Sequence, residues 1–379
     1  MFTRSQLQLA TYVLFVVIIL CLPMFMDEFW TNRMAKYLVY GMLGVAISLS
    51  WGYAGILNLG QGLFFGAGAY MIAMSLKLAS APGEIPSFML GSADPGATTE
   101  LCCITPGSFL WVPFESIWFG LAMALLVPLV LAYLLGAIVF KKGVSGVFVS
   151  IITLAMVLLF RLLVIDAQPL TGGFNGLTGL AWLTVLGIEF DAYSLQTYYL
   201  VAASLVFTLF ATRWLVNSRA GLVQQAIRDD QNRAKYLGFD VSAYQIFFFC
   251  VSALIAGFAG LLYVITSEFV SPTFMDLTFS ISMVIWAAVG GRASLLGACI
   301  GAIMINVFGA VVSESEIFVE AWQAILGLIF VLVVLFLPRG VAGLASDLSD
   351  RFLVKKPVLL EERVDSNVQP AIVGREKTE

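Results

Sequence analysis

The stretch WGYAGILNLGQGLFFGAGAY (residues 51–70) is apolar enough to lie in a lipid bilayer, yet it contains six glycines together with Asn58 and Gln61. Small residues permit close approach of helix backbones, and glycine also permits a helix to break. Irregular backbone is tolerated at membrane depth only where protein buries it or where it lines a water-filled cavity. The stretch therefore predicts either a tightly packed helix interface or a helix broken around Gly60 beside a solute path. The two amides favour the broken helix, because buried amides need partners.

The composition of the whole chain is that of an integral membrane protein. Of its 379 residues 60% are hydrophobic and 12% are charged, and the mean hydropathy is +0.96. The apolar runs are about 17 to 25 residues long, the length that a helix needs to cross a bilayer, and they lack the alternation of a transmembrane barrel. The expected fold is all-α and polytopic, with about ten transmembrane helices. The expected spans are 9–26, 35–50, 54–77, 117–140, 144–165, 196–214, 242–266, 278–290, 296–312 and 320–338.

The placement of lysine and arginine predicts the orientation, because cytoplasmic loops carry the excess of these residues. With ten spans, the basic residues near 141–142, 213–235, 292 and 339–356 all fall on one side. The loops expected on the other side, 79–116, 166–195 and 313–320, are acidic. Both termini are therefore expected in the cytoplasm. Arg33 and Lys36 are exceptions, since they fall on the outer side.

Three regions are expected along the chain. An N-terminal transmembrane helix occupies residues 1–34, a permease core 35–343, and a cytoplasmic tail of mixed charge 344–379. Within the core, the proline-rich segment 79–116 reads as an external loop, and 217–240 as a cytoplasmic coupling region.

A second glycine-rich stretch, WAAVGGRASLLGACIGA (residues 286–302), occupies a comparable place in the C-terminal half. Discontinuous segments in two related halves are typical of transporters built from inverted repeats. We therefore expect spans two to five and spans seven to ten to be related halves around a common path.

The polar stretch NSRAGLVQQAIRDDQNRAKYLGFD (residues 217–240) favours a helix that ends near Gly238. Leu222, Ala226 and Ile227 are predicted to share one side of it, after the small residue Gly221. Arg228 and Asp229 head a charged turn. Such a segment is either a solvated connector or the surface on which a soluble motor pushes a membrane subunit.

Several function classes are disfavoured. The chain has no G-x-x-x-x-G-K-[ST] phosphate loop, so energy must come from a partner or from an ion gradient. The spans contain almost none of the ionisable residues that gradient-driven carriers use, and Arg161 and Asp166 are expected to pair or to snorkel near the outer end. Histidine is absent and the five cysteines are scattered, so no metal or other cofactor is expected. The spans hold no nucleophile, base and orienting partner together, which argues against an enzyme.

The motifs together resemble the membrane subunit of an ATP-binding-cassette importer of the branched-chain amino acid permease superfamily. The resemblance covers about residues 35–345 and rests on WGYAGILNLGQGLFFGAGAY, TGGFNGLTGL, SRAGLVQQAIRDDQNRAKYLGF, VGGRASLLGACIGA and LFLPRGVAGL in that order. Within the superfamily the chain is most similar to the second permease subunit of urea importers, through AIRDDQNRAKYLGF, VIWAAVGGRASLLGA and the long first external loop. Family members more often have histidine where this chain has Gln61.

The resemblance implies a multi-pass protein of the bacterial cytoplasmic (inner) membrane. Its expected partners are a second homologous permease subunit, two cytoplasmic ATP-binding subunits, an external solute-binding protein and the lipid bilayer; no nucleic acid is expected. The 217–240 segment resembles the coupling helix, with the residues Gly221, Leu222, Ala226, Ile227, Arg228, Asp229 and Gly238. Candidates along the route, chosen for their place in broken or loop segments, are Asn58, Gly60, Gln61, Thr171 and Asn175.

The substrate is inferred mainly from the resemblance, which favours urea or a short-chain amide. A path of amides, hydroxyls and carbonyls would suit such a neutral solute. Import of branched-chain amino acids by the same mechanism is the alternative, and a gradient-driven carrier or a passive urea channel is less favoured.

Overall fold

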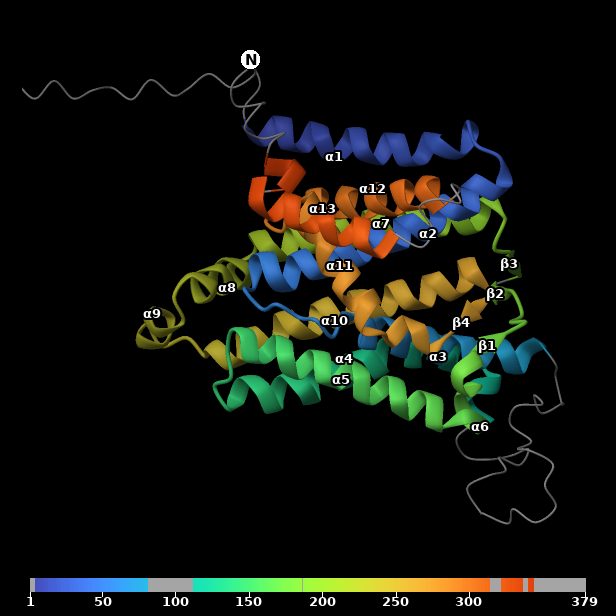
Figure 1. The fold of residues 1–379 in the computed structure, drawn as a ribbon, viewed down its shortest axis with the longest axis horizontal. Helices are drawn as coiled ribbons and strands as arrows, with labels where there is room; N and C mark the ends of the chain where they lie inside the picture. The colour runs from blue at the N-terminus through green and yellow to red at the C-terminus, as the bar shows by residue number, and fades with distance from the viewer. Residues whose placement is uncertain (1–3, 81–111, 186, 314–321, 337–339, 344–379) are drawn as a thin grey trace, which may run out of the picture.

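The computed structural model describes residues 4–80, 112–185, 187–313, 322–336 and 340–343. Within these residues, ten helices correspond to the ten expected spans, and most run side by side along the long axis of the molecule (Figure 1). They are α1 (Arg4–Cys21), α2 (Glu28–Ile47), α3 (Gln61–Ser80), α4 (Ile117–Lys141), α5 (Val147–Asp166), α7 (Leu195–Asn217), α10 (Val241–Ser267), α11 (Leu277–Gly290), α12 (Leu295–Ser313) and α13 (Trp322–Phe336).

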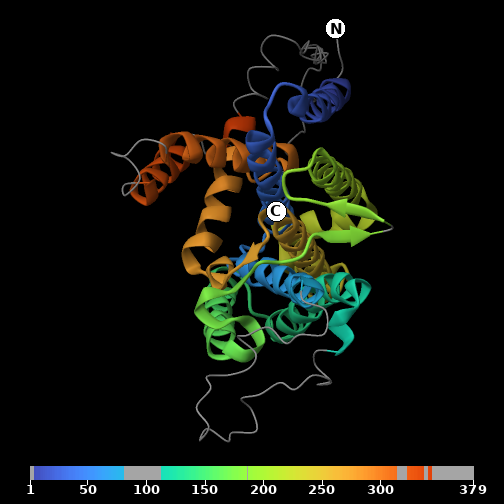
Figure 2. The same cartoon turned by 90° about the vertical axis from the view of Figure 1, so that its right-hand side faces the viewer.

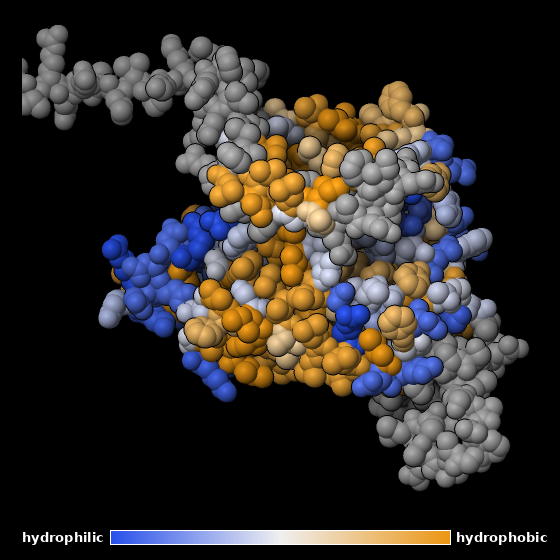
Figure 3. Space-filling model, in the orientation of Figure 1, coloured by the Kyte–Doolittle hydropathy of each residue, from blue (hydrophilic) through white to orange (hydrophobic). Residues whose placement is uncertain are grey.

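The expected polytopic, helical fold is confirmed. Seven helices of the described chain are long and apolar enough to cross a membrane, and α11 is a shorter apolar helix. Figure 3 shows a broad apolar surface over the middle of the molecule, with hydrophilic residues at both ends. This distribution is the one that a bilayer requires of a protein that spans it.

Short elements mark the two ends of the bundle. At one end, which we call the α8 end, lie α8 (Arg219–Asp229) and α9 (Gln231–Tyr236) (Figure 1). The opposite, strand end carries the short helix α6 (Gln168–Thr171) and two small antiparallel sheets. Strand β1 (Leu177–Thr178) pairs with β4 (Phe269–Val270), and β2 (Leu183–Val185) pairs with β3 (Ile188–Phe190).

The charges follow the two ends as the sequence predicts for most positions. Lys141 ends α4 and Arg228 lies in α8, both at the α8 end. Glu189 lies in β3 at the strand end. Lys77, near the end of α3, joins Arg33 and Lys36 as an exception, and its ammonium group donates hydrogen bonds to the carbonyls of two strand-end residues.

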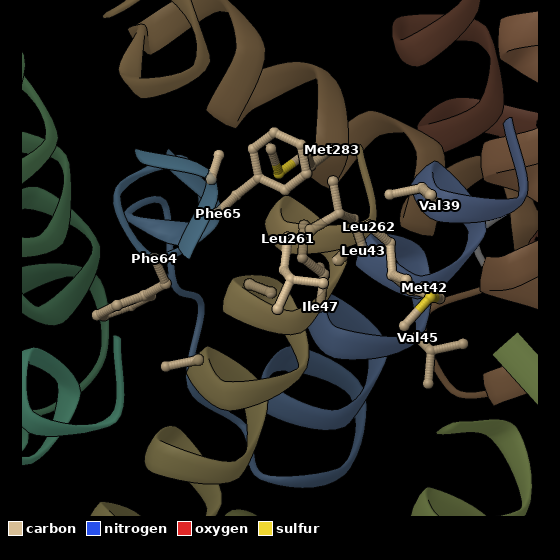
Figure 4. Packing of buried hydrophobic residues seen from close by; sticks show 14 of the residues in the cluster. Val39, Met42, Leu43, Val45, Ile47, Phe64, Phe65, Leu261, Leu262 and Met283 are labelled. Carbon is tan, nitrogen blue, oxygen red and sulfur yellow. The ribbon is translucent and has the colours of Figure 1, made fainter. Parts of the chain in front are cut away.

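Helices α2, α3 and α10 form the centre of the bundle (Figure 2). In the most apolar stretch of each helix, 78% of the residues are buried in α2 and in α3, and 72% in α10. The corresponding share is 33% in α4 and 22% in α5. Figure 4 shows Leu43, Phe65 and Leu262 meeting in this core from the three central helices, with Met283 of α11 beside them. The outer helices are therefore the ones that face lipid or another subunit.

Small residues allow α3 and α10 to pack backbone against backbone. A β-carbon on Gly68 would lie 2.2 Å from the carbonyl oxygen of Gly257, and one on Gly260 would lie 2.0 Å from that of Phe65. No side chain fits at such distances, so part of the glycine content serves close helix packing.

Both halves contain an interrupted pair of helices. After α2 the chain forms a π-helical segment, Ser48–Tyr53, and stays irregular until α3 begins at Gln61. We call this stretch, residues 48–60, the first break. The predicted break around Gly60 is confirmed, although the expected helix start at residue 54 is wrong by seven residues. In the second half the interruption lies between α10 and α11, at residues 268–276, which we call the second break. The glycine-rich stretch 286–302 instead contains the turn from α11 to α12.

Candidate functional site

A buried amide network closes the first break. The Asn58 side chain, 1% exposed, donates from Nδ2 to Oε1 of Gln61 over 2.7 Å and accepts at Oδ1 from the backbone N–H of Gly60 over 2.8 Å. Gln61, 0% exposed, donates from Nε2 to the carbonyl and hydroxyl oxygens of Ser252 in α10 over 2.9 and 3.2 Å. The Ser252 hydroxyl then donates to the carbonyl of Ala46. Three of the predicted path residues therefore lie together, and protein groups satisfy their amides.

Helix α5 contacts both interruptions. Near the α8 end, Ser150 Oγ donates to the carbonyl of Leu57, and Thr153 Oγ1 accepts from the backbone N–H of Leu59 over 3.2 Å. Near the strand end, Arg161 forms a 2.7 Å ion pair with Asp276, whose carboxylate also accepts from the Leu277 N–H at the start of α11. Arg161 therefore does pair, but with Asp276 of the second break and not with Asp166 as the sequence suggested.

The other two path candidates lie apart from the amide network. Thr171 ends α6 and bonds through its hydroxyl to the carbonyls of Val164 and Ala167, so it closes the turn after α5. Asn175 is exposed at the end of the 3-10 helix Gly173–Asn175 that follows. The structure thus joins Asn58, Gly60 and Gln61, and leaves Thr171 and Asn175 on the surface of one end.

The predicted coupling segment is two helices rather than one. Helix α8 ends at Asp229, and Asp230 caps α9 by accepting hydrogen bonds from the backbone N–H groups of Asn232 and Arg233. An aspartate favours such a cap over a helix interior, which is why the helix stops there. Gly238 follows α9 with φ of +87°, as expected for a residue that ends a helix.

The three apolar residues predicted to share one side of this segment do not. Leu222 is 60% exposed and Ala226 is also exposed, whereas Ile227 is 0% exposed and packs with Ala234 and Val241. One turn of helix separates Leu222 from Ala226, and Ile227 points away from both. Because α8 has a buried face toward the bundle, only the first two are available to a partner.

Two side chains of α8 bind the first part of the first break. Gln224, 0% exposed, donates from Nε2 to the carbonyl of Ala54 over 3.0 Å. Arg228 donates from Nη1 to the carbonyl of Gly52 over 2.7 Å. Gln224, Ser252 and the α5 hydroxyls could not be identified from the sequence, because single polar residues in apolar or helical stretches carry no pattern that identifies their partners.

The polar groups at the two breaks are hydrogen-bonding and charged groups. Within the described residues, no cluster of three histidine, cysteine, aspartate or glutamate side chains could hold a metal ion. They are amides, hydroxyls and backbone carbonyls, together with Arg228 at the first break and the Arg161–Asp276 pair at the second. Such groups can bind a small polar solute and can change partners when helices move.

Comparison with known proteins gives the family. Residues 30–334 match the family described as branched-chain amino acid transport system / permease component. The chain is 26% identical over 328 residues to the high-affinity branched-chain amino acid transport system permease protein LivM of Salmonella typhimurium and, equally, to that of Escherichia coli; each alignment covers 80% of this chain and 67% of the relative. It is 23% identical over 272 residues to a probable branched-chain amino acid transport permease protein LivM of Methanocaldococcus jannaschii, which covers 69% of this chain and 75% of the relative.

No solved structure matches the chain. The family match covers most of the described helices, including both interruptions and α8. The chain is thus a multi-pass membrane protein that acts as the permease component of a transport system and not as its ATPase, and it belongs to the family of branched-chain amino acid transport permeases.

Proposed function

We propose that the protein is the membrane subunit of an ATP-driven importer that translocates branched-chain amino acids delivered by an external binding protein. Two cytoplasmic ATPases and a second, homologous permease complete the assembly. The family and the names of the relatives support this solute class. The α8 end is cytoplasmic in this proposal, in agreement with its basic residues and the positive-inside rule.

The observation that carries the proposal is a set of exposed large apolar side chains at the hydrophilic α8 end (Figure 3). Helices α8 and α9 project beyond the bundle (Figure 1). Leu222 is 60% exposed, Tyr236 90% and Leu237 76%. Large apolar side chains at a charged, water-facing end indicate a protein interaction site rather than a lipid contact. A channel or a gradient-driven carrier has no need of such a surface.

The solute path in this proposal runs beside the first break. In the described conformation the amides of Asn58 and Gln61 bind each other and the protein. Movement of α3 relative to α10, whose Ser252 accepts from Gln61, would free these amides for the solute. Thr171 and Asn175 would then contribute to the outer entrance, where the binding protein docks.

Urea is the second candidate solute. The motifs AIRDDQNRAKYLGF and VIWAAVGGRASLLGA favour it, since they resemble the permease of urea importers. Neutral amides at the break suit urea as well as they suit the polar end of an amino acid.

Uptake of labelled leucine and labelled urea by cells with and without the gene tests the proposal. The solutes are supplied at micromolar concentration, and a parallel set of cells is depleted of ATP. Loss of ATP-dependent leucine uptake on deletion supports the main proposal. Loss of urea uptake alone keeps the importer and replaces its solute. Uptake that survives ATP depletion under a maintained ion gradient contradicts ATP-driven import.

A further inference from the structure

The contact between α8 and the first break is held by an oriented arginine. The carboxylate of Asp229 accepts hydrogen bonds from Nε and Nη2 of Arg228, over 3.0 and 2.9 Å. This fork leaves Nη1 for the carbonyl of Gly52. Arginine presents its donors in a fixed plane, so fixing two of them aims the third. Asp229 therefore positions the group that binds the break.

Glycine at position 55 permits this contact. Gly55 has φ of +73°, and a β-carbon there would lie 2.6 Å from Cγ of Arg228. The stem of Arg228 thus lies directly against the backbone of the break. Together with Gln224, it attaches α8 to the backbone of the break at Gly52, Ala54 and Gly55.

The same segment binds the turn between α11 and α12. Ser48 Oγ donates to the carbonyl of Arg292 over 2.9 Å, and Tyr53 donates from its hydroxyl to the carbonyl of Ala293 over 2.9 Å. The guanidinium of Arg292 lies 5.0 Å from the centre of the Trp51 ring. Backbone packing reinforces these bonds, since a β-carbon on Gly52 would lie 1.8 Å from the Arg292 carbonyl oxygen.

We propose that residues 48–54 are the junction through which α8 moves both halves of the permease, and that Gln224 and Arg228 are the positioning residues that transmit the movement. A displacement of α8 reaches the carbonyls of Gly52 and Ala54 directly. It reaches the second half through the turn at residues 291–294. The inference deepens the proposed function and rests on it, because an ATPase must displace α8.

Hydrogen–deuterium exchange of the purified complex in nanodiscs tests the inference without knowledge of the solute. Residues 54–60 lie outside helices, so their amides report on the break. The exchange of these amides is compared with and without a non-hydrolysable ATP analogue. The test variants are Gln224→Met and Arg228→Met, and Arg228→Lys is the conservative variant, which keeps a cationic donor.

Two neighbours provide matched controls. Gln225 in the same helix donates to the carbonyls of Val216 and Gly221 rather than to the break, and Arg233 pairs with Asp230 on the surface. Gln225→Met and Arg233→Met should leave the response of the break intact. Co-purification of the ATPase and its basal hydrolysis show that each variant assembles.

We expect the Gln224→Met and Arg228→Met variants to assemble and to hydrolyse ATP. In both, the nucleotide-dependent change in exchange at residues 54–60 should fall about tenfold, which corresponds to about 1.4 kcal/mol of lost coupling. Arg228→Lys should retain most of the change. An undiminished change in both methionine variants would overturn the inference. A wild-type complex without a bound ATPase would instead refute the proposed function on which the inference rests.

Discussion

Replacement of Gln61 by methionine should destabilise the protein by about 2–4 kcal/mol. The substitution keeps the volume of the side chain but removes its three hydrogen bonds to Asn58 and Ser252. Because both partners are buried, the orphaned Nδ2 donor of Asn58 costs about 1–3 kcal/mol, and the lost bond to the Ser252 carbonyl costs about 1 kcal/mol more. The Ser252 hydroxyl keeps its bond to Ala46 and adds little.

Unfolding by SDS titration in mixed micelles measures this free energy. Gln245→Met is the matched control: Gln245 is 5% exposed on α10, and within the described residues its side chain forms no hydrogen bond. The control should change the free energy of unfolding by less than about 0.5 kcal/mol. A Gln61→Met variant as stable as the control would refute the argument that the amide network braces the break.

Two further substitutions test packing and the α5 contact. Gly260→Ala should cost about 3 kcal/mol and lower the yield of folded protein, because its β-carbon would lie 2.0 Å from the Phe65 carbonyl oxygen. Gly327→Ala is the control: a β-carbon there has no atom within 4 Å, so the variant should be neutral in the same SDS titration. Equal stability of the two variants would contradict the packing argument. A double-mutant cycle on Arg161→Gln and Asp276→Asn should give a coupling energy of about 1–3 kcal/mol, because the 2.7 Å ion pair joins α5 to the start of α11. Additive effects of the two substitutions would show that the ion pair does not hold α5.

The architecture could be read largely from the sequence because it depends on hydrophobic length. Each apolar run of sufficient length became a helix, and the glycine-rich stretch at residues 51–70 predicted a break where the structure has one. A bilayer imposes these lengths whatever the neighbours are. The register of the break was less predictable, since Leu57 and Leu59 are apolar yet lie in irregular backbone, where hydroxyls of α5 bond to their main-chain groups.

The contacts of the site could not be predicted, because they join residues far apart in the chain. Gln61 and Ser252 are 191 positions apart, and Gln224 and Ala54 are 170 apart. Single polar residues in helices carry no sign of such partners. Leu222 and Ile227 were grouped by helical periodicity alone, but the burial of Gln224 and Ile227 shows that the face toward the bundle is set by tertiary packing.

Purification of the tagged chain from its own membranes tests the central claim most directly. We expect an ATP-hydrolysing subunit to co-purify with the wild-type protein. Leu222→Glu, which places a charge on the exposed face of α8, should lose that subunit while the chain itself stays folded, and Leu237→Glu on the α9 side tests the edge of the same surface. A wild-type protein that purifies without any ATPase and hydrolyses no ATP would contradict the account.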